Sequence, residues 1–279
     1  MPPTVHTYRS GEPALFVNSY LVEGDEGVVS IDAPMFVSDA HAYRARLDAL
    51  HKPLAGVLIT HPHPDHYNGL TVLVEGLDVP VVAMPEVDRE IRESDDAKRA
   101  QWGPLFGDEW PEQSTFPSEQ ATDGERVELG GLRFTPTDLG PGESVSETIW
   151  HLDGDGQPTA FVGDLVFDGT HSYIADGLTA DWIESLDRAA ELIDPSATLY
   201  VGHGDPVGVD AIADQRRYLM MLREAVRRIA GGGERLEPEA ADELVRTMRE
   251  FTGGAPLEWL LTRGCDGVAA ELAGESGNR

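Results

Sequence analysis

Cysteine and lysine are almost absent from this chain of 279 residues. The one cysteine, Cys265, has no partner for an internal disulfide, which is typical of proteins from a reducing cytoplasm. An isolated cysteine is more often a small buried side chain than a reactive group, so we expect Cys265 to be structural. Two of the 21 basic residues are lysines, Lys52 and Lys98, and the other 19 are arginines.

Positive charge of any kind is scarce. The 21 basic residues stand against 50 acidic ones, which gives a net charge of −29. Such a surface repels nucleic acids, because binding to their backbones depends on Lys and Arg side chains that neutralise phosphates. We therefore expect no nucleic-acid partner and interpret the acidity as a solubilising surface.

Long apolar runs are missing as well. No stretch approaches the roughly 20 apolar residues that span a bilayer. Residues 1–6 lack the basic start and the apolar run of a signal peptide. We therefore expect a cytoplasmic protein with no membrane partner. Its 41% hydrophobic content is enough for the core of one α/β domain.

Histidine, in contrast, is concentrated directly after an apolar run. Residues 57–69 read VLITHPHPDHYNG, and the run at 57–59 predicts a buried strand that ends in a Pro-punctuated loop. Imidazole and carboxylate together suit zinc, iron or manganese. A chance cluster of surface histidines is the alternative, and the strand in front of the loop argues against it. The candidate ligands in this loop are His61, His63, Asp65 and His66.

Three further candidate ligands follow other strand-like runs. Asp164 and His203 each come directly after an apolar run, and Glu143 lies in the loop after a third. Alone, an Asp after Gly is usually a turn residue or a helix cap. Because α/β sheets gather their ligands beyond the carboxyl ends of strands, we expect these side chains to meet the histidine loop.

In this order the motifs resemble those of the metallo-β-lactamase superfamily, over about residues 14–210. Asp32 matches its first motif, HPHPDH the second, Asp164 the fourth and His203 the fifth. The resemblance implies an α/β fold, the four-layer αββα sandwich of metallo-β-lactamase type, with two divalent metal ions or one at a sheet edge. It also implies that His61 and His63 bind the first metal, that Asp65, His66 and His203 bind the second, and that Asp164 bridges them.

One position departs from the family pattern. Glu143 stands where the third motif normally supplies a histidine within Gly-His-(Ser/Thr). Either Glu143 replaces that histidine as an oxygen ligand of the first metal, or the ligand is lost and Glu143 or Glu147 is a solvated loop acid. We favour ligation, because the Gly-Pro-Gly turn at 140–142 keeps its usual place. Zinc is the usual metal of the family, and the added carboxylate shifts the preference toward iron or manganese.

The resemblance implies a metal-dependent hydrolase of a small-molecule ester, thioester or lactone. A metal-bound hydroxide attacks the substrate, and the catalytic candidates are Asp65, which orients the hydroxide, and Asp164. The alternative is a di-iron oxygenase or oxidase of the same fold with Glu143 as an iron ligand, since a minor branch of the superfamily is similar in carrying Glu there. The third class, a non-catalytic metal-binding protein, is disfavoured because the other motifs match.

Four aromatic residues punctuate the segment 101–120, which Pro and Gly residues break after a predicted helix at 86–99. In a loop-rich segment these aromatics either line a pocket, which implies an apolar or aromatic small-molecule substrate, or pack as a satellite core. The four are Trp102, Phe106, Trp110 and Phe116.

After His203 the chain is predicted to be helical, at 210–229, 237–251 and 256–262, and to fray at 275–279. We therefore expect a metallo-β-lactamase-fold domain at 1–210 and, at 211–279, C-terminal helices packed on the same domain. His171, Tyr67 and Tyr173 are candidates for substrate contact or support of the site, whereas His151 on a predicted strand is structural. The oligomeric state stays open.

Overall fold

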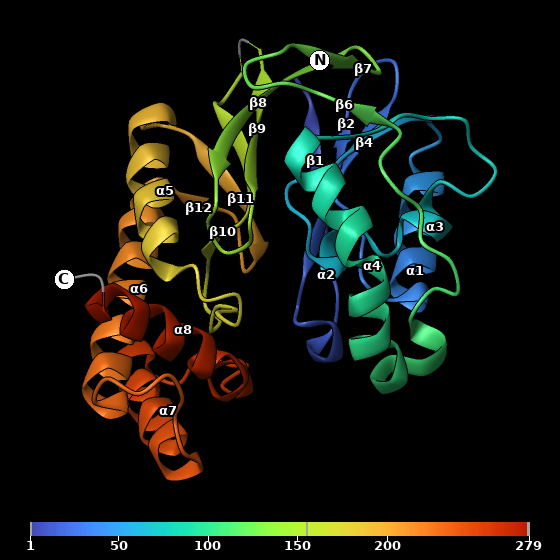
Figure 1. Cartoon of the computed structure of the whole chain (residues 1–279). Coiled ribbons are helices and arrows are strands. Elements are labelled where there is room, and N and C mark those ends of the chain that lie inside the picture. The colour runs from blue at the N-terminus through green and yellow to red at the C-terminus, as the bar shows by residue number, and fades with distance from the viewer. Residues whose placement is uncertain (1, 155, 278–279) are drawn as a thin grey trace.

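Two β-sheets stacked face to face, with a layer of helices outside each, make up the structure, a computed structural model that describes residues 2–154 and 156–277 (Figure 1). Helices from the N-terminal half cover one sheet and helices from the C-terminal half cover the other. This is the four-layer αββα arrangement that the resemblance implies, so the expected fold class is confirmed.

The first sheet comes from the N-terminal half, and its strands lie side by side in chain order. They are β1 (Thr4–Arg9), β2 (Asn18–Glu23), β3 (Val28–Ile31), β4 (Leu54–Leu58), β5 (Val81–Ala83) and β6 (Glu119–Gln120). The strands β1 to β3 pair antiparallel, and β3 to β6 pair parallel. Because parallel strands end at the same edge, the segments that follow β3 and β4 come together there.

The second sheet has the same size and a mirrored order, from β12 back to β7. Its strands are β7 (Val127–Leu129), β8 (Leu132–Gly140), β9 (Glu147–Asp153), β10 (Thr159–Phe167), β11 (Thr198–His203) and β12 (Val207–Gly208). Among the described strands of this sheet, only β10 and β11 pair parallel. The segments that follow β10 and β11, the strands predicted to lead to Asp164 and His203, therefore lie at the same edge of the sheet.

The helices fill the outer layers, and three large hydrophobic clusters of the described residues hold the layers together. Helices α1 (Val37–Ala49), α2 (Pro64–Tyr67), α3 (Leu70–Leu73) and α4 (Pro85–Phe106) belong to the first half, and α5 (Thr179–Leu192), α6 (Asp210–Ala230), α7 (Pro238–Thr252) and α8 (Trp259–Gly277) to the second. Between the sheets, Tyr20 and Leu58 pack with Phe134, Trp150 and Phe161. The other two cores lie under the outer helices.

The C-terminal helices share the core under the second sheet. Leu219 of α6, Leu244 of α7 and Leu261 of α8 are buried in the same cluster as Trp182 of α5 and Leu199 of β11. Cys265 is buried in this cluster as well, which agrees with its expected structural role. The boundary at residue 210 stays a prediction.

Two helices are longer than the sequence pattern predicts. Helix α4 continues through Pro104, so Trp102 and Phe106 lie on a helix rather than in a loop. Helix α8 extends to Gly277, where fraying was expected from Glu275. Instead Glu275 pairs with Arg223 of α6, which anchors this end of α8; residues 278 and 279 lie outside the described residues.

None of the helices in residues 2–154 and 156–277 is both long enough and apolar enough to cross a bilayer. The cytoplasmic location itself stays a prediction.

Candidate metal centre and pocket

The first group of candidate ligands lies just beyond β4 and the end of β8. His61 and His63 follow β4, and Glu143 lies in the turn between β8 and β9. One ligand atom of each falls within 4.8 Å of the others. The Glu143 Oε2 atom lies 2.8 Å from His63 Nδ1 and 3.7 Å from His61 Nε2. The turn therefore brings Glu143 to the two histidines, as the sequence order predicts.

The second group combines the other end of the histidine loop with the second sheet. Asp65, His66, Asp164 and His203 also offer ligand atoms within 4.8 Å of one another. His203 Nε2 lies 3.4 Å from an Asp65 oxygen and 3.2 Å from Asp164 Oδ2. His66 Nε2 lies 3.2 Å from Asp164 Oδ1. All four side chains are buried.

Asp164 faces both groups, because its Oδ2 atom also lies 3.9 Å from His61 Nε2. The expectation that Asp164 follows its strand is wrong: β10 continues to Phe167, and the pairing of β10 with β11 shifts register around Gly163. Gly163 has a φ of 51°, and a Cβ atom there would press on Thr60 and His61. The irregularity in β10, rather than a strand end, therefore aims Asp164 at the site.

Hydrogen bonds behind the histidines fix which ring nitrogen faces the site. His66 Nδ1 donates to Asp32 Oδ2 at 2.8 Å, and Asp32 also accepts from the Thr60 amide and hydroxyl at 2.9 and 2.8 Å. Since the Thr60 hydroxyl donates to Asp32, it is free to accept from His61 Nδ1 at 3.0 Å. These bonds direct the Nε2 atoms of His61 and His66 into the centre.

The other two histidines are oriented in the same way. His203 Nδ1 donates to the Leu15 carbonyl at 2.8 Å, so Nε2 faces Asp65 and Asp164. His63 is turned round: Nε2 donates to Asp176 at 3.2 Å, and Nδ1 faces Glu143. Asp176 was not among the residues singled out in the sequence, because an Asp in a Gly-containing loop is the commonest kind of turn residue.

Several ligand atoms are buried without any hydrogen-bond partner among the described residues. Buried polar atoms are nearly always satisfied, so a cluster of unpaired ones points to a missing partner. Every one is an imidazole nitrogen or a carboxylate oxygen, which are the ligand atoms that bind zinc, iron and manganese. The residues thus fit divalent metal ions. The unpaired atoms are His61 Nε2, His66 Nε2, Glu143 Oε1 and Oε2, and Asp164 Oδ1.

The protein groups alone shift the pKa values of the carboxyls in opposite directions. Burial raises the pKa of Asp164, but His203 and His66 outweigh burial and hold it well below its usual range. Burial raises the pKa of Glu143 well above its usual range, and His63 offsets only part of this. Glu143 therefore gains most from a cation that stabilises its ionised form.

Glu143 and Glu147 are both buried, at 2% and 1% exposure, so the alternative of a solvated loop acid is contradicted for each. Glu147 Oε1 accepts from the amide and the hydroxyl of Ser144, at 2.8 and 2.6 Å, which fixes the turn that carries Glu143. Burial raises the pKa of Glu147 to about 7. Glu147 thus orders the turn from outside the ligand group.

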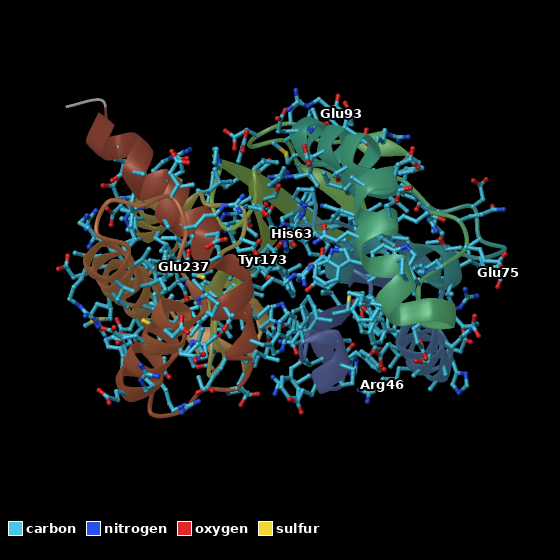
Figure 2. The ribbon with its side chains drawn as sticks, turned by 60° about the horizontal axis from the view of Figure 1, so that its bottom comes forward. Arg46, His63, Glu75, Glu93, Tyr173 and Glu237 are labelled. Carbon is cyan, nitrogen blue, oxygen red and sulfur yellow. The ribbon has the colours of Figure 1, made fainter. Side chains whose placement is uncertain are left out.

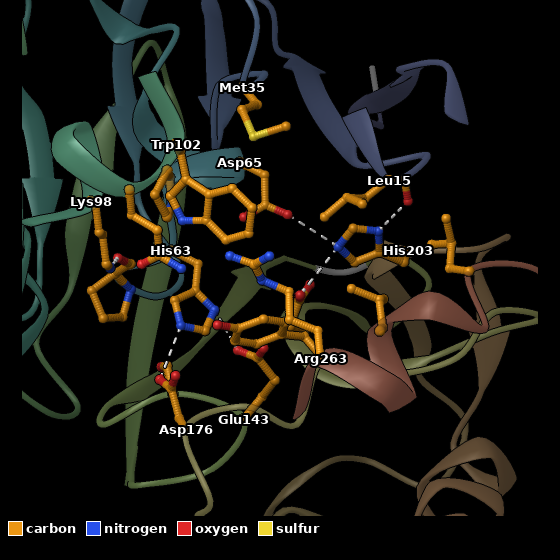
Figure 3. A pocket seen from close by; sticks show the side chains of 18 of the residues that line it. Leu15, Met35, His63, Asp65, Lys98, Trp102, Glu143, Asp176, His203 and Arg263 are labelled. Atoms are coloured by element: carbon orange, nitrogen blue, oxygen red, sulfur yellow. Dashed lines mark hydrogen bonds and ion pairs between the residues drawn. The ribbon is translucent and has the colours of Figure 1, made fainter. Parts of the chain in front are cut away.

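The centre forms part of the wall of a cavity of about 490 Å³ (Figure 3). His63 and Tyr173 lie together in the interior, whereas the labelled acids Glu75 and Glu93 lie at the periphery (Figure 2). Much of the remaining lining is apolar and comes from α4, α8 and the N-terminal loops. Its larger apolar members are Leu15, Met35, Trp102, Leu105, Phe106, Trp110, Phe167, Leu257, Trp259 and Leu260.

The aromatic segment 101–120 was expected either to line a pocket or to pack as a satellite core, and each alternative is correct for some of its residues. Trp102, Phe106 and Trp110 line the cavity, and their rings follow one another in near-parallel pairs. Phe106 also packs on the small cluster around Met35, and Phe116 packs on the core beneath α4. The cavity wall is therefore continuous with the core, which fixes the shape of the pocket.

The remaining candidates divide in the same way. Tyr173 lines the cavity with its ring 5.3 Å from that of His63. His171 is buried against Tyr218, and Tyr67 is buried in the core under the first sheet. Neither lines the cavity. His151 accepts or donates a hydrogen bond with Thr137 on the neighbouring strand, as expected of a structural residue.

Comparison with known proteins places this geometry in a family. A family model described as the metallo-beta-lactamase superfamily matches residues 13–204. The hydroxyacylglutathione hydrolase of Methylobacillus flagellatus is 26% identical over 166 residues, which are 59% of this chain and 54% of that protein. The chain thus matches about half the length of this curated relative.

Two solved structures share the fold. The metallo-beta-lactamase family protein TTHA1429 from Thermus thermophilus superimposes with a TM-score of 0.71 at 22% identity, over 99% of this chain and 94% of that one. The structure of TTHA1623 in a di-iron-bound form has a TM-score of 0.58 at 28% identity, over 75% of this chain and 96% of that one.

Proposed function

The chain belongs to the metallo-beta-lactamase superfamily, and from this membership we propose that it is a metal-dependent hydrolase of a small-molecule ester, thioester or lactone. The observation that carries the proposal is the convergence of two ligand groups on one wall of an apolar cavity. A relative named hydroxyacylglutathione hydrolase, an enzyme for a thioester, agrees with this class of reaction.

In the proposed centre, His61, His63 and Glu143 would hold one divalent cation, and Asp65, His66 and His203 would hold the second. Asp164 would be a ligand of both, which is supported by its distances of 3.2 to 3.9 Å to histidines of both groups. When bound, the cations polarise the substrate carbonyl and supply a water that loses its proton near neutral pH.

The protein side chains divide the remaining work. Asp65 lines the cavity beside the other candidate ligands, where its carboxylate orients the attacking water. Asp32 and Asp176 hold the rings of His66 and His63 from behind, so the ligand nitrogens need no reorganisation during turnover. The apolar walls exclude bulk water from the reacting group.

The test is hydrolysis of a panel of aryl esters, thioesters and lactones by the metal-loaded protein. A His61→Ala/His63→Ala variant is expected to lose turnover to the background rate, because both residues belong to the proposed first ligand group. The matched control is His151→Gln, a histidine on a strand outside the cavity, which keeps the activity. Full activity in the double variant contradicts a metal-dependent mechanism.

Glu143 favours a second candidate, a di-iron oxygenase or oxidase. A carboxylate in place of a neutral imidazole makes the first group harder and more anionic, which favours iron or manganese over zinc. The di-iron-bound form of TTHA1623, 28% identical, shows that a related fold holds two irons. Oxygen uptake by the iron-loaded protein with aromatic substrates, absent with zinc, would decide for this candidate over hydrolysis.

A further inference from the structure

Beyond the candidate ligands, the cavity contains two cationic side chains, Lys98 of α4 and Arg263 of α8. Lys98 is already engaged: it donates to the Pro62 carbonyl at 2.5 Å, and the carboxylates of Asp176 and Glu90 attract its charge. Arg263 has neither a hydrogen bond nor an ion pair with any other described residue. One free positive charge therefore faces a mainly apolar cavity.

Arg263 is held in place by stacking. Its guanidinium carbon lies 4.3 Å from the centre of the Trp102 ring, and the side chain reaches from α8 toward this ring across the cavity (Figure 3). A guanidinium that stacks through its face keeps its N–H groups at the edge, where they can bind a carboxylate through two parallel hydrogen bonds.

The packing of α8 sets this position. Gly264 and Gly267 press the helix backbone against residues 174–177, where a Cβ atom on either glycine would collide with main-chain atoms. Further along the helix, Arg223 of α6 donates to Glu271 at 2.7 Å. Arg263 lies outside residues 13–204, which match the family, so the shared motifs do not specify it.

We propose that Arg263, supported by Trp102, recognises a carboxylate on the substrate, and that the substrate joins this carboxylate to an apolar or aromatic body. The proposal rests on the proposed function, because it assigns the bond to be cleaved to the ligand wall of the same cavity. The body packs on Met35, Leu105 and Trp259.

A binding experiment tests this without turnover. Calorimetric titration of the metal-loaded protein compares 4-phenylbutanoate with the neutral 4-phenylbutanamide. In Arg263→Gln, we expect the affinity for the carboxylate to fall about tenfold, with a smaller change for the amide. The control is Arg227→Gln, on the outer face of α6, which retains both affinities. Equal losses for both ligands, or none, overturn the proposal; an unchanged carboxylate affinity means that the metals alone bind it.

A kinetic experiment extends the test to substrates. Mono-4-nitrophenyl adipate and 4-nitrophenyl hexanoate have the same chain length, but only the first ends in a carboxylate. Arg263→Gln is expected to lower the kcat/KM ratio of the adipate over the hexanoate about tenfold, mainly through KM. An unchanged ratio overturns the assignment of Arg263. If the wild type hydrolyses neither ester, the hydrolase proposal fails for these esters, while the titration still decides on Arg263.

Discussion

Exchange of Asp32 for asparagine tests what fixes the orientation of His66, because the exchange leaves every candidate metal ligand in place. Asp32 accepts three hydrogen bonds, two from Thr60 and one from His66 Nδ1 at 2.8 Å. Asparagine keeps the shape and one acceptor oxygen, but its amide nitrogen donates where the second oxygen accepted. His66 Nδ1 must then accept, and its proton moves to Nε2, the atom that faces Asp164 at 3.2 Å.

A protonated Nε2 cannot bind a metal, so Asp32→Asn is expected to weaken the second ligand group most. Loss of a partner behind a metal-binding histidine costs about 10- to 100-fold in metal affinity, or roughly 1.4 to 2.7 kcal/mol. The first group is expected to lose less affinity, because only His61 depends on Asp32, through the Thr60 hydroxyl, whereas Asp176 holds His63. The variant is thus expected to lose more affinity for one metal than for the other.

The assay is a competition titration of zinc between the protein and a chromophoric chelator. The matched control is Asp39→Asn on α1, whose carboxylate accepts from Tyr8 at 2.6 Å, away from the cavity lining. Wild-type affinity for both metals in Asp32→Asn would refute the orienting role. Loss of both metals would show that Asp32 supports the whole centre rather than His66.

Three further predictions concern packing and charge. Gly202→Ala places a methyl group against the Asp164 carboxylate, so elemental analysis should find fewer metal ions and urea denaturation a loss of about 1 to 3 kcal/mol. The Arg223 side chain is 10% exposed, and Arg223→Ala leaves Glu271 without its cationic partner. We expect the free energy of unfolding to fall by about 3 kcal/mol, and an unchanged urea midpoint contradicts this. Burial lowers the pKa of His171, so the unfolded chain takes up its proton first and stability is lost as the pH falls below 6.5. The melting temperature of His171→Gln should therefore fall less than that of the wild type between pH 7 and pH 5.

The sequence predicts the parts of the fold that local pattern controls. The apolar runs at 57–59 and 198–202 lie on strands or directly after one. These strands place the histidine loop and His203 at the edge of the sheets where the candidate ligands meet. The α4 helix is longer than predicted because it continues through Pro104, where only the one main-chain hydrogen bond that an N–H would donate is missing. Helix α8 continues well beyond the predicted segment 256–262, and Gly264 and Gly267 within it allow close packing against residues 174–177.

What the sequence leaves hidden are contacts between distant segments. Asp176 and Arg263 have no motif of their own, and each acquires its role from a partner far along the chain, His63 and Trp102. The same holds for Asp164, whose direction depends on an irregularity that Gly163 permits beside Thr60. A pattern of single residues predicts the ligand types, whereas their orientation comes from tertiary packing.

We propose that seven side chains hold two divalent cations, with Glu143 as one of the ligands. The most direct test is the metal content of protein purified without chelator, by elemental analysis, in the wild type and in Glu143→Ala. We expect two metal ions per chain in the wild type and loss of the one at His61 and His63 in the variant. Two metal ions in Glu143→Ala, bound as tightly as in the wild type, would contradict it.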